Sequence, residues 1–380
     1  MAKFNPGGRA ETEASVVRLS VPGKVILMGE HAAVYGRPAV VAAVDLRLTV
    51  EARSDPTGVG RIRLNLPDLG LQEEHSWPAL EDFTNRARSR WGRFEAGDVS
   101  FKPADDRSAL VRIAVGEAAA SLPPAVSKRL RRWGLELRLR SQLPVGAGLG
   151  SSAAAAVGVV AAVRALAGSR VRSPDELAAI EAAALEVERR QHGFPSGIDS
   201  GTVLRGGVLL VRRSGGELRF DDLPRPEWLR GAVGILDSGT PSQTTGAVVT
   251  AVRRRYEDEP ERTTALFDRI EAAVESFRAA LRDGGPRHAA TAVADGHRAL
   301  VELGVVPPAV ARRIASVEAA GGAAKISGAG ALEGGSAGAL ICMLAGRSAE
   351  TIVGISDLES VNAAIGAGGL RFESPTADRL

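Results

Sequence analysis

LPVGAGLGSSAAAA, residues 143–156, is the stretch of this sequence that decides the fold. Three glycines within five residues leave the backbone unrestrained, whereas the alanines that follow are the strongest helix formers. The stretch therefore predicts a loop that turns into a helix at Ser151 and Ser152. Free backbone N–H groups converge at such a helix start. Together with the helix dipole and two hydroxyls they favour a bound anion, phosphate above all.

The glycine pattern alone leaves an alternative open. It is not the GxxxxGK[ST] phosphate loop, because no lysine precedes the serines, and it is not a GxGxxG loop after a parallel strand with an acid further on. Taken by itself, the stretch also fits a glycine-rich turn that lets a helix pack closely against a sheet.

Composition sets the broad class of the protein. Its 380 residues indicate about two domains. No apolar run reaches the roughly 18 residues that span a bilayer, and the start lacks the apolar core of a signal peptide. The single cysteine, Cys342, allows no internal disulfide, so we expect a cytoplasmic protein with no membrane partner. A net charge of +3 and an aromatic content of 4% argue against a nucleic-acid partner.

Hydrophobic periodicity predicts both kinds of element in the first half of the chain. Alternation with a period of two, in residues 46–52 and 133–143, predicts antiparallel strands with one solvated face. Ser173 and Glu176 form the capping box of a helix. The helical patterns lie at 109–122, after Ser152, and from 174 to about 189.

The pattern changes near residues 221–230, after which long helices dominate. The second half closes with three strand-like segments around an expected helix, AETIVGI (residues 349–355). We therefore expect an α+β fold with mixed rather than purely parallel sheets. Its expected parts are a flexible tail over 1–15, an N-terminal domain over 16–225 and a C-terminal domain over 226–380.

Two carboxylates lie around the expected end of the third helix. Glu188 ends the helical pattern, and Asp199 follows eleven residues later, after the turn sequence HGFPSG. In phosphoryl transfer one carboxylate commonly holds magnesium while another addresses the hydroxyl nucleophile. A pair of ordinary surface charges is the alternative.

PGKVILMGEHAAVYG, residues 22–36, gathers a base, an acid and an imidazole. The Pro-Gly pair at 22–23 is expected to break a strand just before Lys24, and the next glycine to place Glu30 and His31 in a tight turn. Such groups could bind a small polar substrate. The alternative is that Lys24 is a solvated side chain and that Glu30 and His31 are ordinary turn residues. Lysine is scarce, so each one invites a role; the five are Lys3, Lys24, Lys102, Lys128 and Lys325.

These segments, in this order, resemble the GHMP superfamily of small-molecule kinases. PGKVILMGEHAAVYG is similar to its first motif, LPVGAGLGSSAAAA to its nucleotide-binding second motif, and KISGAGALEGGSAGAL (residues 325–340) to its third. HGFPSGIDSGTVLRGG (residues 192–207) is most similar to the mevalonate kinases of the superfamily. The resemblance spans most of the chain and implies a two-domain α+β fold, with the active site in the cleft between the domains.

The resemblance implies a role for each matched residue. Asp199 would deprotonate or orient the substrate hydroxyl, and Lys24 would keep that carboxylate ionised and stabilise the transferred group. Ser152 and Glu188 would hold Mg²⁺. The substrate would contact Glu30, His31, Ser196, Gly328 and Ala329, and the ATP phosphates would lie against Gly146, Ala147, Gly148, Leu149, Gly150, Ser151 and Ser152.

The implied reaction is ATP-dependent phosphorylation of mevalonate to 5-phosphomevalonate, an isoprenoid precursor, with ATP and Mg²⁺ as cofactors. One alternative is another GHMP kinase that acts on phosphomevalonate or a sugar. The other is a catalytically inactive nucleotide or metabolite sensor, which would have no chemical need for Lys24, Glu188 and Asp199. The sequence does not decide the oligomeric state, and a homodimer is compatible with it.

The third motif departs from the resemblance at one point. Ala331, Leu332 and Glu333 interrupt the string of glycines that such kinases usually carry after SGAG. Because a glutamate near phosphates is repulsive, we expect the loop to bulge and Glu333 to point away.

Overall fold

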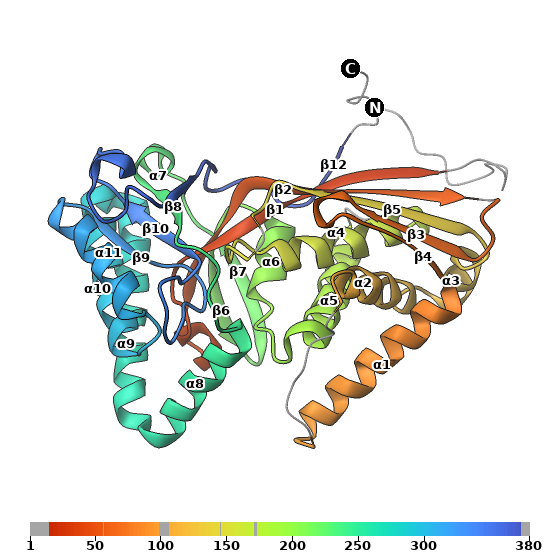
Figure 1. The fold of residues 1–380 in the computed structure, drawn as a ribbon, viewed down its shortest axis with the longest axis horizontal. Helices are drawn as coiled ribbons and strands as arrows, with labels where there is room; N and C mark the ends of the chain where they lie inside the picture. The colour runs from red at the N-terminus through yellow and green to blue at the C-terminus, as the bar shows by residue number, and fades with distance from the viewer. Residues whose placement is uncertain (1–14, 56, 99–105, 145, 171–172, 374–380) are drawn as a thin grey trace.

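The computed structural model describes residues 15–55, 57–98, 106–144, 146–170 and 173–373, which form two lobes (Figure 1). The N-terminal lobe is the eight-stranded sheet with helices α1–α6, and the C-terminal lobe is the four-stranded sheet with helices α7–α11. The tail expected over 1–15 lies outside the described residues, except for Ser15.

The N-terminal sheet is mixed, as expected. Its strands run in the order β12-β1-β2-β5-β3-β4, while β6 pairs with β2 and β7 pairs with β6. Every neighbouring pair is antiparallel except β3 and β5, which are parallel. The strands are β1 (Val16–Met28), β2 (Ala39–Asp55), β3 (Arg61–Leu66), β4 (Leu71–Ser76), β5 (Gly134–Ser141), β6 (Val208–Ser214), β7 (Glu217–Asp222) and β12 (Arg371–Phe372).

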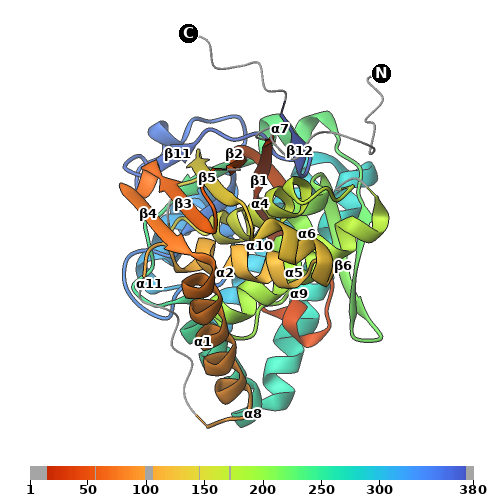
Figure 2. The same cartoon turned by 90° about the vertical axis from the view of Figure 1, so that its right-hand side faces the viewer.

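Helices cover one face of this sheet (Figures 1 and 2). In β2, Leu48 and Val50 are buried and Thr49 between them is partly exposed, as the alternating pattern predicted. Helix α4 packs directly on β2, because a Cβ atom on Gly158 would lie only 2.9 Å from Val50 Cγ2. The helices are α1 (Trp77–Glu95), α2 (Ala109–Ala120), α3 (Pro124–Leu130), α4 (Ser151–Leu166), α5 (Pro174–His192) and α6 (Ile198–Arg205).

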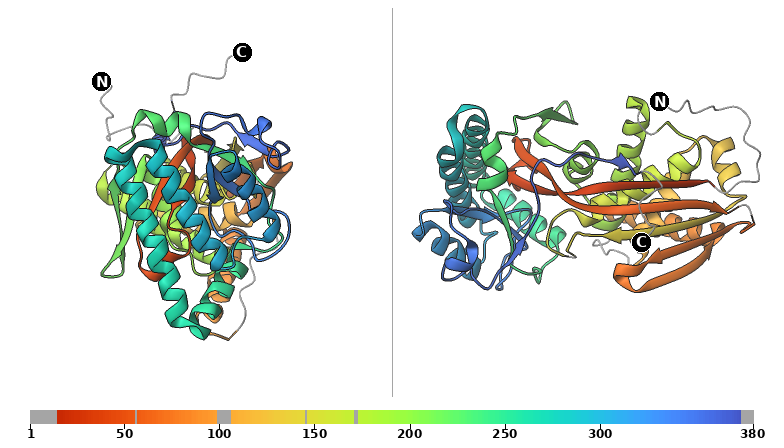
Figure 3. Two further views of the ribbon diagram at one scale, coloured as in Figure 1. Left: turned by 90° about the vertical axis from the view of Figure 1, so that its left-hand side faces the viewer. Right: turned by 90° about the horizontal axis from the view of Figure 1, so that it is seen from above.

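The C-terminal lobe packs helices on an antiparallel sheet with the strand order β11-β8-β10-β9. Strands β9 and β10 are buried along their whole length, and α9 and α10 lie side by side (Figure 3). The elements are α7 (Glu227–Ala232), β8 (Gly234–Asp237), α8 (Thr245–Asp258), α9 (Pro260–Ala279), α10 (Gly285–Glu302), α11 (Pro308–Ala319), β9 (Ala323–Ile326), β10 (Ala339–Met343) and β11 (Glu359–Val361).

Each lobe contributes a segment to the other. The connection between β1 and β2 reaches into the C-terminal lobe (Figure 3). There Tyr35 stacks on Phe267 of α9, with ring centroids 4.5 Å apart. In the other direction β12 pairs with β1, and the buried Arg47 guanidinium donates hydrogen bonds to Gly368 O at 2.9 Å and Gly369 O at 2.7 Å. Residues 226–373 therefore contribute to both sheets.

Two local expectations were wrong. Strand β1 does not break at residues 22–23 but continues through them with a shift in register. Gly23 instead permits a close approach, since its Cβ atom would lie 2.8 Å from Leu149 O. AETIVGI forms only a 3-10 turn over Ala349–Thr351, because the β-branched residues and glycine that follow disfavour a helix.

Five helices were not expected, namely α1, α3, α6, α7 and α10. Helix α1 does carry start signals, because Ser76 Oγ accepts a hydrogen bond from Ala79 N and a proline follows at the first turn. Helix α6 is only eight residues long and follows the HGFPSG turn, and α10 begins at a glycine after a π-helical turn. The short pattern of α6 gives little periodic signal, whereas α1 and α10 are long and amphipathic and were overlooked.

Candidate active site

Residues 146–152, called the glycine loop here, lead into the N-terminus of α4. Gly146, Gly148 and Gly150 have φ angles of 81°, 76° and 77°, in the left-handed region that glycine tolerates best. No side chain caps α4, and the hydroxyls of Ser151 and Ser152 make no hydrogen bond within the described residues. The expected turn from loop to helix is confirmed, and its first N–H groups and hydroxyls are available to an anion.

Backbone hydrogen bonds fix the glycine loop between the lobes. Lys24 N of β1 donates to Leu149 O at 2.8 Å, and Ala339 N of β10 donates to Ala147 O at 3.0 Å. The side chains of Ala147 and Leu149 are buried, so these two residues can offer a ligand only their backbone. The loop is therefore held from both sides before any nucleotide binds.

Lys24 and Asp199 form an ion pair beside this loop. Lys24 Nζ lies 3.0 Å from Asp199 Oδ2, with the lysine side chain 5% exposed and the aspartate 37% exposed. Asp199 lies in the first turn of α6. The aliphatic stem of Lys24 packs against the loop, because a Cβ atom on Gly150 would lie 2.7 Å from Lys24 Cγ. The amine thus reaches a carboxylate while its stem touches the expected phosphate site.

Glu188 is a buried carboxylate near this pair. It lies within α5, which continues four residues beyond it rather than ending there as expected. Burial, and secondarily the charge of Asp199, raises the pKa of Glu188 to about 8, whereas Lys24 acts to lower it. Within the described residues its carboxylate has no hydrogen bond or ion pair. A buried carboxylate without a partner is costly, and a cation would offset that cost.

The residues present fit a magnesium ion that is completed by other ligands. No group of three or more His, Cys, Asp or Glu side chains within the described ranges could hold a metal by itself. Mg²⁺ is commonly bound through one or two carboxylates together with substrate phosphates and water. Glu188 and the free hydroxyl of Ser152 match that partial set.

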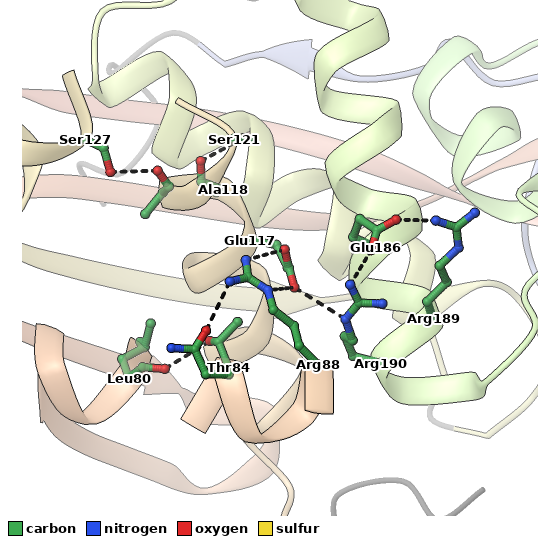
Figure 4. Close-up of polar contacts among 12 residues, drawn as sticks. Leu80, Thr84, Arg88, Glu117, Ala118, Ser121, Ser127, Glu186, Arg189 and Arg190 are labelled. Atoms are coloured by element: carbon green, nitrogen blue, oxygen red, sulfur yellow. Dashed lines mark hydrogen bonds and ion pairs between the residues drawn. The ribbon is translucent and has the colours of Figure 1, made fainter. Parts of the chain in front are cut away.

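A charged cluster fastens the helix that carries Glu188 (Figure 4). Arg88 of α1 binds Glu117 of α2 with two hydrogen bonds, of 3.0 and 2.7 Å. Arg190 of α5 pairs with the same carboxylate at 3.6 Å and also with Glu186. Because Glu117 and Arg190 are both buried, this cluster holds the last turns of α5 against α1 and α2.

Residues 29–31, called the first-motif turn here, pack against residues 325–330, called the third-motif loop. Glu30 pairs with Lys325, and both side chains are almost completely buried. His31 Nε2 lies 2.9 Å from Ala329 O, and burial lowers the pKa of this imidazole to about 4. The structure thus brings Glu30, His31 and Ala329 together, at the junction of the two lobes.

Ser196 precedes α6, and Glu333 follows the third-motif loop. Ser196 Oγ accepts a hydrogen bond from Ile198 N at 3.2 Å, so it supports the start of α6. Glu333 is exposed, and its carboxylate accepts a hydrogen bond from Gln243 Nε2 at 3.2 Å. Ala331 is buried and donates its N–H to Val305 O. Of the three interrupting residues, Leu332 and Glu333 are therefore exposed, whereas Ala331 is buried.

Comparison with known proteins identifies the family. A family model described as GHMP kinases N terminal domain matches residues 115–207. The chain is 32% identical to the mevalonate kinase of Thermococcus sibiricus over 320 residues, which are 83% of this chain and 86% of that protein. The chain belongs to the mevalonate kinase family.

Solved structures share the fold of this family member. The Methanococcus jannaschii mevalonate kinase superposes with a TM-score of 0.71 at 22% identity, covering 92% of this chain and 98% of that chain. The L. major mevalonate kinase in complex with R-mevalonate superposes with a TM-score of 0.65 at 19% identity, covering 94% of this chain and 98% of that chain.

In the described part of the chain, no helix combines the length and apolar character needed to cross a bilayer.

Three residues at the site of this family member were not predicted as site residues. Lys325 had a signal, because lysine is scarce and this one precedes a glycine-rich loop. Ser327 Oγ accepts a hydrogen bond from Ile26 N at 2.9 Å, and Thr240 lies beside Gly146, whose Cβ atom would be 2.7 Å from Thr240 Oγ1. Single serines and threonines in loops carry no periodic or charge signal that could have found these two.

Proposed function

We propose that the chain transfers the γ-phosphoryl group of ATP to the primary hydroxyl of mevalonate. The observation that carries this function is the 3.0 Å pair between Lys24 and Asp199, placed against the glycine loop. A polarising amine, a carboxylate and a phosphate site meet there, as transfer to an alcohol requires. The 32% identity to a mevalonate kinase over most of both chains supports the acceptor.

In this proposal Asp199 accepts or orients the proton of the attacking hydroxyl. The hydroxyl oxygen forms a bond to the γ-phosphorus, the bond from that phosphorus to the bridging oxygen breaks, and ADP leaves with the electron pair. Lys24 balances the charge of Asp199 and stabilises charge on the transferred group. Positioning and electrostatics supply most of the barrier reduction in such loose transfers, so the fixed pair matters more than basicity.

The glycine loop binds the nucleotide in this proposal. Its backbone N–H groups and the N-terminus of α4 hold the phosphates. Magnesium, held by Ser152 and Glu188, would neutralise phosphate charge when it is bound. These ligands fit because the Ser152 hydroxyl is free within the described residues and Glu188 is a buried carboxylate in need of a cation.

Charge near the site favours mevalonate over phosphomevalonate. A phosphorylated acceptor adds about two negative charges, which arginine forks usually neutralise. Three arginines next to the catalytic segments already have carboxylate partners, whereas Arg213 donates to Ser196 O and Arg253 lies over the Phe194 ring. Arg189 and Arg190 pair with Glu186, and Arg205 pairs with Glu181.

The test is ADP formation with mevalonate and phosphomevalonate side by side, with a hexose as the third acceptor. We expect kcat/KM for mevalonate to exceed the other two values by at least about a hundredfold, the discrimination that a mismatched charged group commonly gives. A kcat/KM that favours phosphomevalonate or the hexose would contradict the acceptor and leave a kinase. No ADP formation with any acceptor would support a sensor.

A further inference from the structure

Three contacts connect the first motif to the third motif. Glu30 pairs with Lys325, His31 Nε2 lies 2.9 Å from Ala329 O, and Ile26 N donates to Ser327 Oγ at 2.9 Å. The paired segments are about three hundred residues apart in sequence. They join the end of β1 and the turn after it to Lys325 in β9 and to the loop that follows β9, where the two lobes meet.

The ion pair is enclosed by protein. The side chains of Lys325 and Glu30 are 0% and 1% exposed. Lys325 Nζ also donates to Ile326 O at 2.7 Å, while Glu30 Oε2 has no hydrogen-bond partner within the described residues. Burial raises the pKa of Glu30 and lowers the pKa of Lys325, and the charge of each partner opposes that shift. Each charge is therefore stabilised mainly by the other.

The pair lies next to a strained turn. His31 has φ 61° and ψ −51°, and Ala32 N donates to Glu30 O at 2.7 Å, which together define a γ-turn centred on His31. A γ-turn with positive φ is rare for a residue other than glycine. Such strain persists only where the surroundings over-determine it. Glu30 is anchored on one side of the turn by Lys325, and the His31 ring is anchored by Ala329.

We propose that Glu30 and Lys325 are positioning residues, and that their buried ion pair holds the first-motif turn against the third-motif loop without either side chain contacting substrate. The first-motif turn and the third-motif loop both border the candidate active site. Ser327 accepts the hydrogen bond from Ile26, two residues after Lys24, and its carbonyl faces Gly148, whose Cβ atom would lie 3.7 Å away. The pair thus fixes Lys24 relative to the glycine loop.

A positioning role and a substrate contact predict different solvent accessibility and different kinetic effects of mutation. An amine or a carboxylate that binds mevalonate must be reachable from solvent before the substrate arrives, whereas a positioning pair stays covered at all times. Removal of a substrate contact raises KM, and misalignment of reacting groups mainly lowers kcat. The inference rests on the proposed function only for its kinetic readout.

The first experiment labels the native full chain. Reductive methylation followed by peptide mass spectrometry reports the accessibility of each lysine amine. Lys325 should stay unmodified with or without ATP and mevalonate, while the exposed Lys128 is modified under the same conditions. Modification of Lys325 in the free enzyme that ATP or mevalonate prevents would overturn the proposal. This experiment needs no activity, so it is independent of the proposed function and of how any variant folds.

The second experiment is a double-mutant cycle of Glu30→Gln and Lys325→Met. Each single variant leaves a buried charge unpaired, so we expect kcat to fall roughly 10- to 100-fold, the usual effect of misaligned reacting groups, with both KM values within about threefold of wild type. The double variant removes both charges and should recover at least about tenfold in kcat over the weaker single variant. Losses that multiply in the double variant would overturn the proposal.

A matched control uses an exposed pair in the same lobe. Arg269 and Glu302 lie 2.7 Å apart with side chains 46% and 51% exposed. Arg269→Met with Glu302→Gln should leave kcat within about twofold, because exposed pairs contribute little. A rise of more than about tenfold in KM for mevalonate in Glu30→Gln, with kcat kept, would make Glu30 a substrate contact. If the enzyme prefers another acceptor, the cycle is read with that acceptor, so failure of the proposed function does not decide the pair.

Discussion

Lys24 joins the acceptor side of the site to the nucleotide side. Its amine lies 3.0 Å from Asp199, its stem packs on Gly150, and its charge opposes the rise in the pKa of Glu188. The backbone N–H of the same residue holds the glycine loop through Leu149 O. A single lysine is thus in contact with, or electrostatically coupled to, Asp199, Glu188 and the glycine loop.

The Lys24 and Asp199 pair should act as one unit. We expect Asp199→Asn to lower kcat by at least about a hundredfold with little change in ATP affinity, and Lys24→Met to do the same. The double variant should lose less than the product of the two single losses, because either change already breaks the pair. Steady-state ADP release measures this. Turnover at the wild-type rate in either single variant would remove that residue from the active site.

Glu188 should make the stability of the magnesium-free protein depend on pH. Its pKa is about 8 in the folded chain and about 4.5 when unfolded, so the folded state binds more protons between these values. Its contribution to the free energy of unfolding is therefore fully present below about pH 4.5. Between about pH 4.5 and pH 8 it falls by about 1.4 kcal/mol for each pH unit, and above pH 8 it is lost.

The comparison is urea unfolding of wild type and Glu188→Gln without metal or nucleotide. The variant should gain free energy of unfolding relative to wild type between about pH 5 and about pH 9. The lack of a pH dependence in that difference would mean that Glu188 is solvated or paired in solution.

Elements were predicted from the sequence where the signal is local. The turn from glycine loop to helix at Ser151, the cap of α5 at Ser173 and the alternating strand β2 depend on residue types within a few positions of one another. Helix α6 was missed because it is short, and the role of β1 at Gly23 was misjudged because the reason for that glycine is the distant Leu149. The Glu30 and Lys325 pair has no local signal at all, since it forms only when the lobes meet.

The glycine loop gives a prediction at the scale of one element. Gly150 has φ 77°, and a Cβ atom there would press on Lys24 Cγ at 2.7 Å. Gly150→Ala should cost about 1–2 kcal/mol of stability through its left-handed backbone and should also displace Lys24, lowering kcat by about tenfold or more.

Gly215 provides the matched control for this change. It has φ 60° in the turn between β6 and β7, with nothing within 4 Å of its added Cβ atom. Gly215→Ala should lose similar stability in thermal unfolding but keep its kcat. Equal kcat losses in the two variants would show that backbone strain, rather than contact with Lys24, explains the effect.

At the scale of the whole molecule, each lobe is completed by a segment that comes from the other half of the chain. Arg47 holds the returning C-terminal segment on the N-terminal lobe, since its buried guanidinium binds the carbonyls of Gly368 and Gly369 and also Ser20 O at 3.0 Å. Burial lowers the pKa of Arg47 to about 10 without removing its charge near neutral pH. The order in which the chain crosses between the sheets could not be predicted, because neither glycine carries a signal for its partner.

Arg47→Met should destabilise the whole fold without changing the chemistry. The variant leaves buried carbonyls unpaired, so we expect a loss of about 2–4 kcal/mol in the free energy of unfolding. The folded fraction should keep the kcat of wild type. Arg140→Met is the control, because Arg140 is exposed on the neighbouring strand β5 and should cost less than about 0.5 kcal/mol. Equal losses in urea unfolding would contradict the role of Arg47.

The pairing of β12 with β1 has a consequence for synthesis on the ribosome. The edge of β1 at Leu19 and Ser20 acquires its partner only when Phe372 and Arg371 have been translated, about 350 residues later. Until then a nascent chain presents an unpaired strand edge, which is a template for pairing with other chains. Stalled or prematurely terminated products should therefore aggregate far more readily than the finished chain. Chaperones would have to bind them, or proteases degrade them.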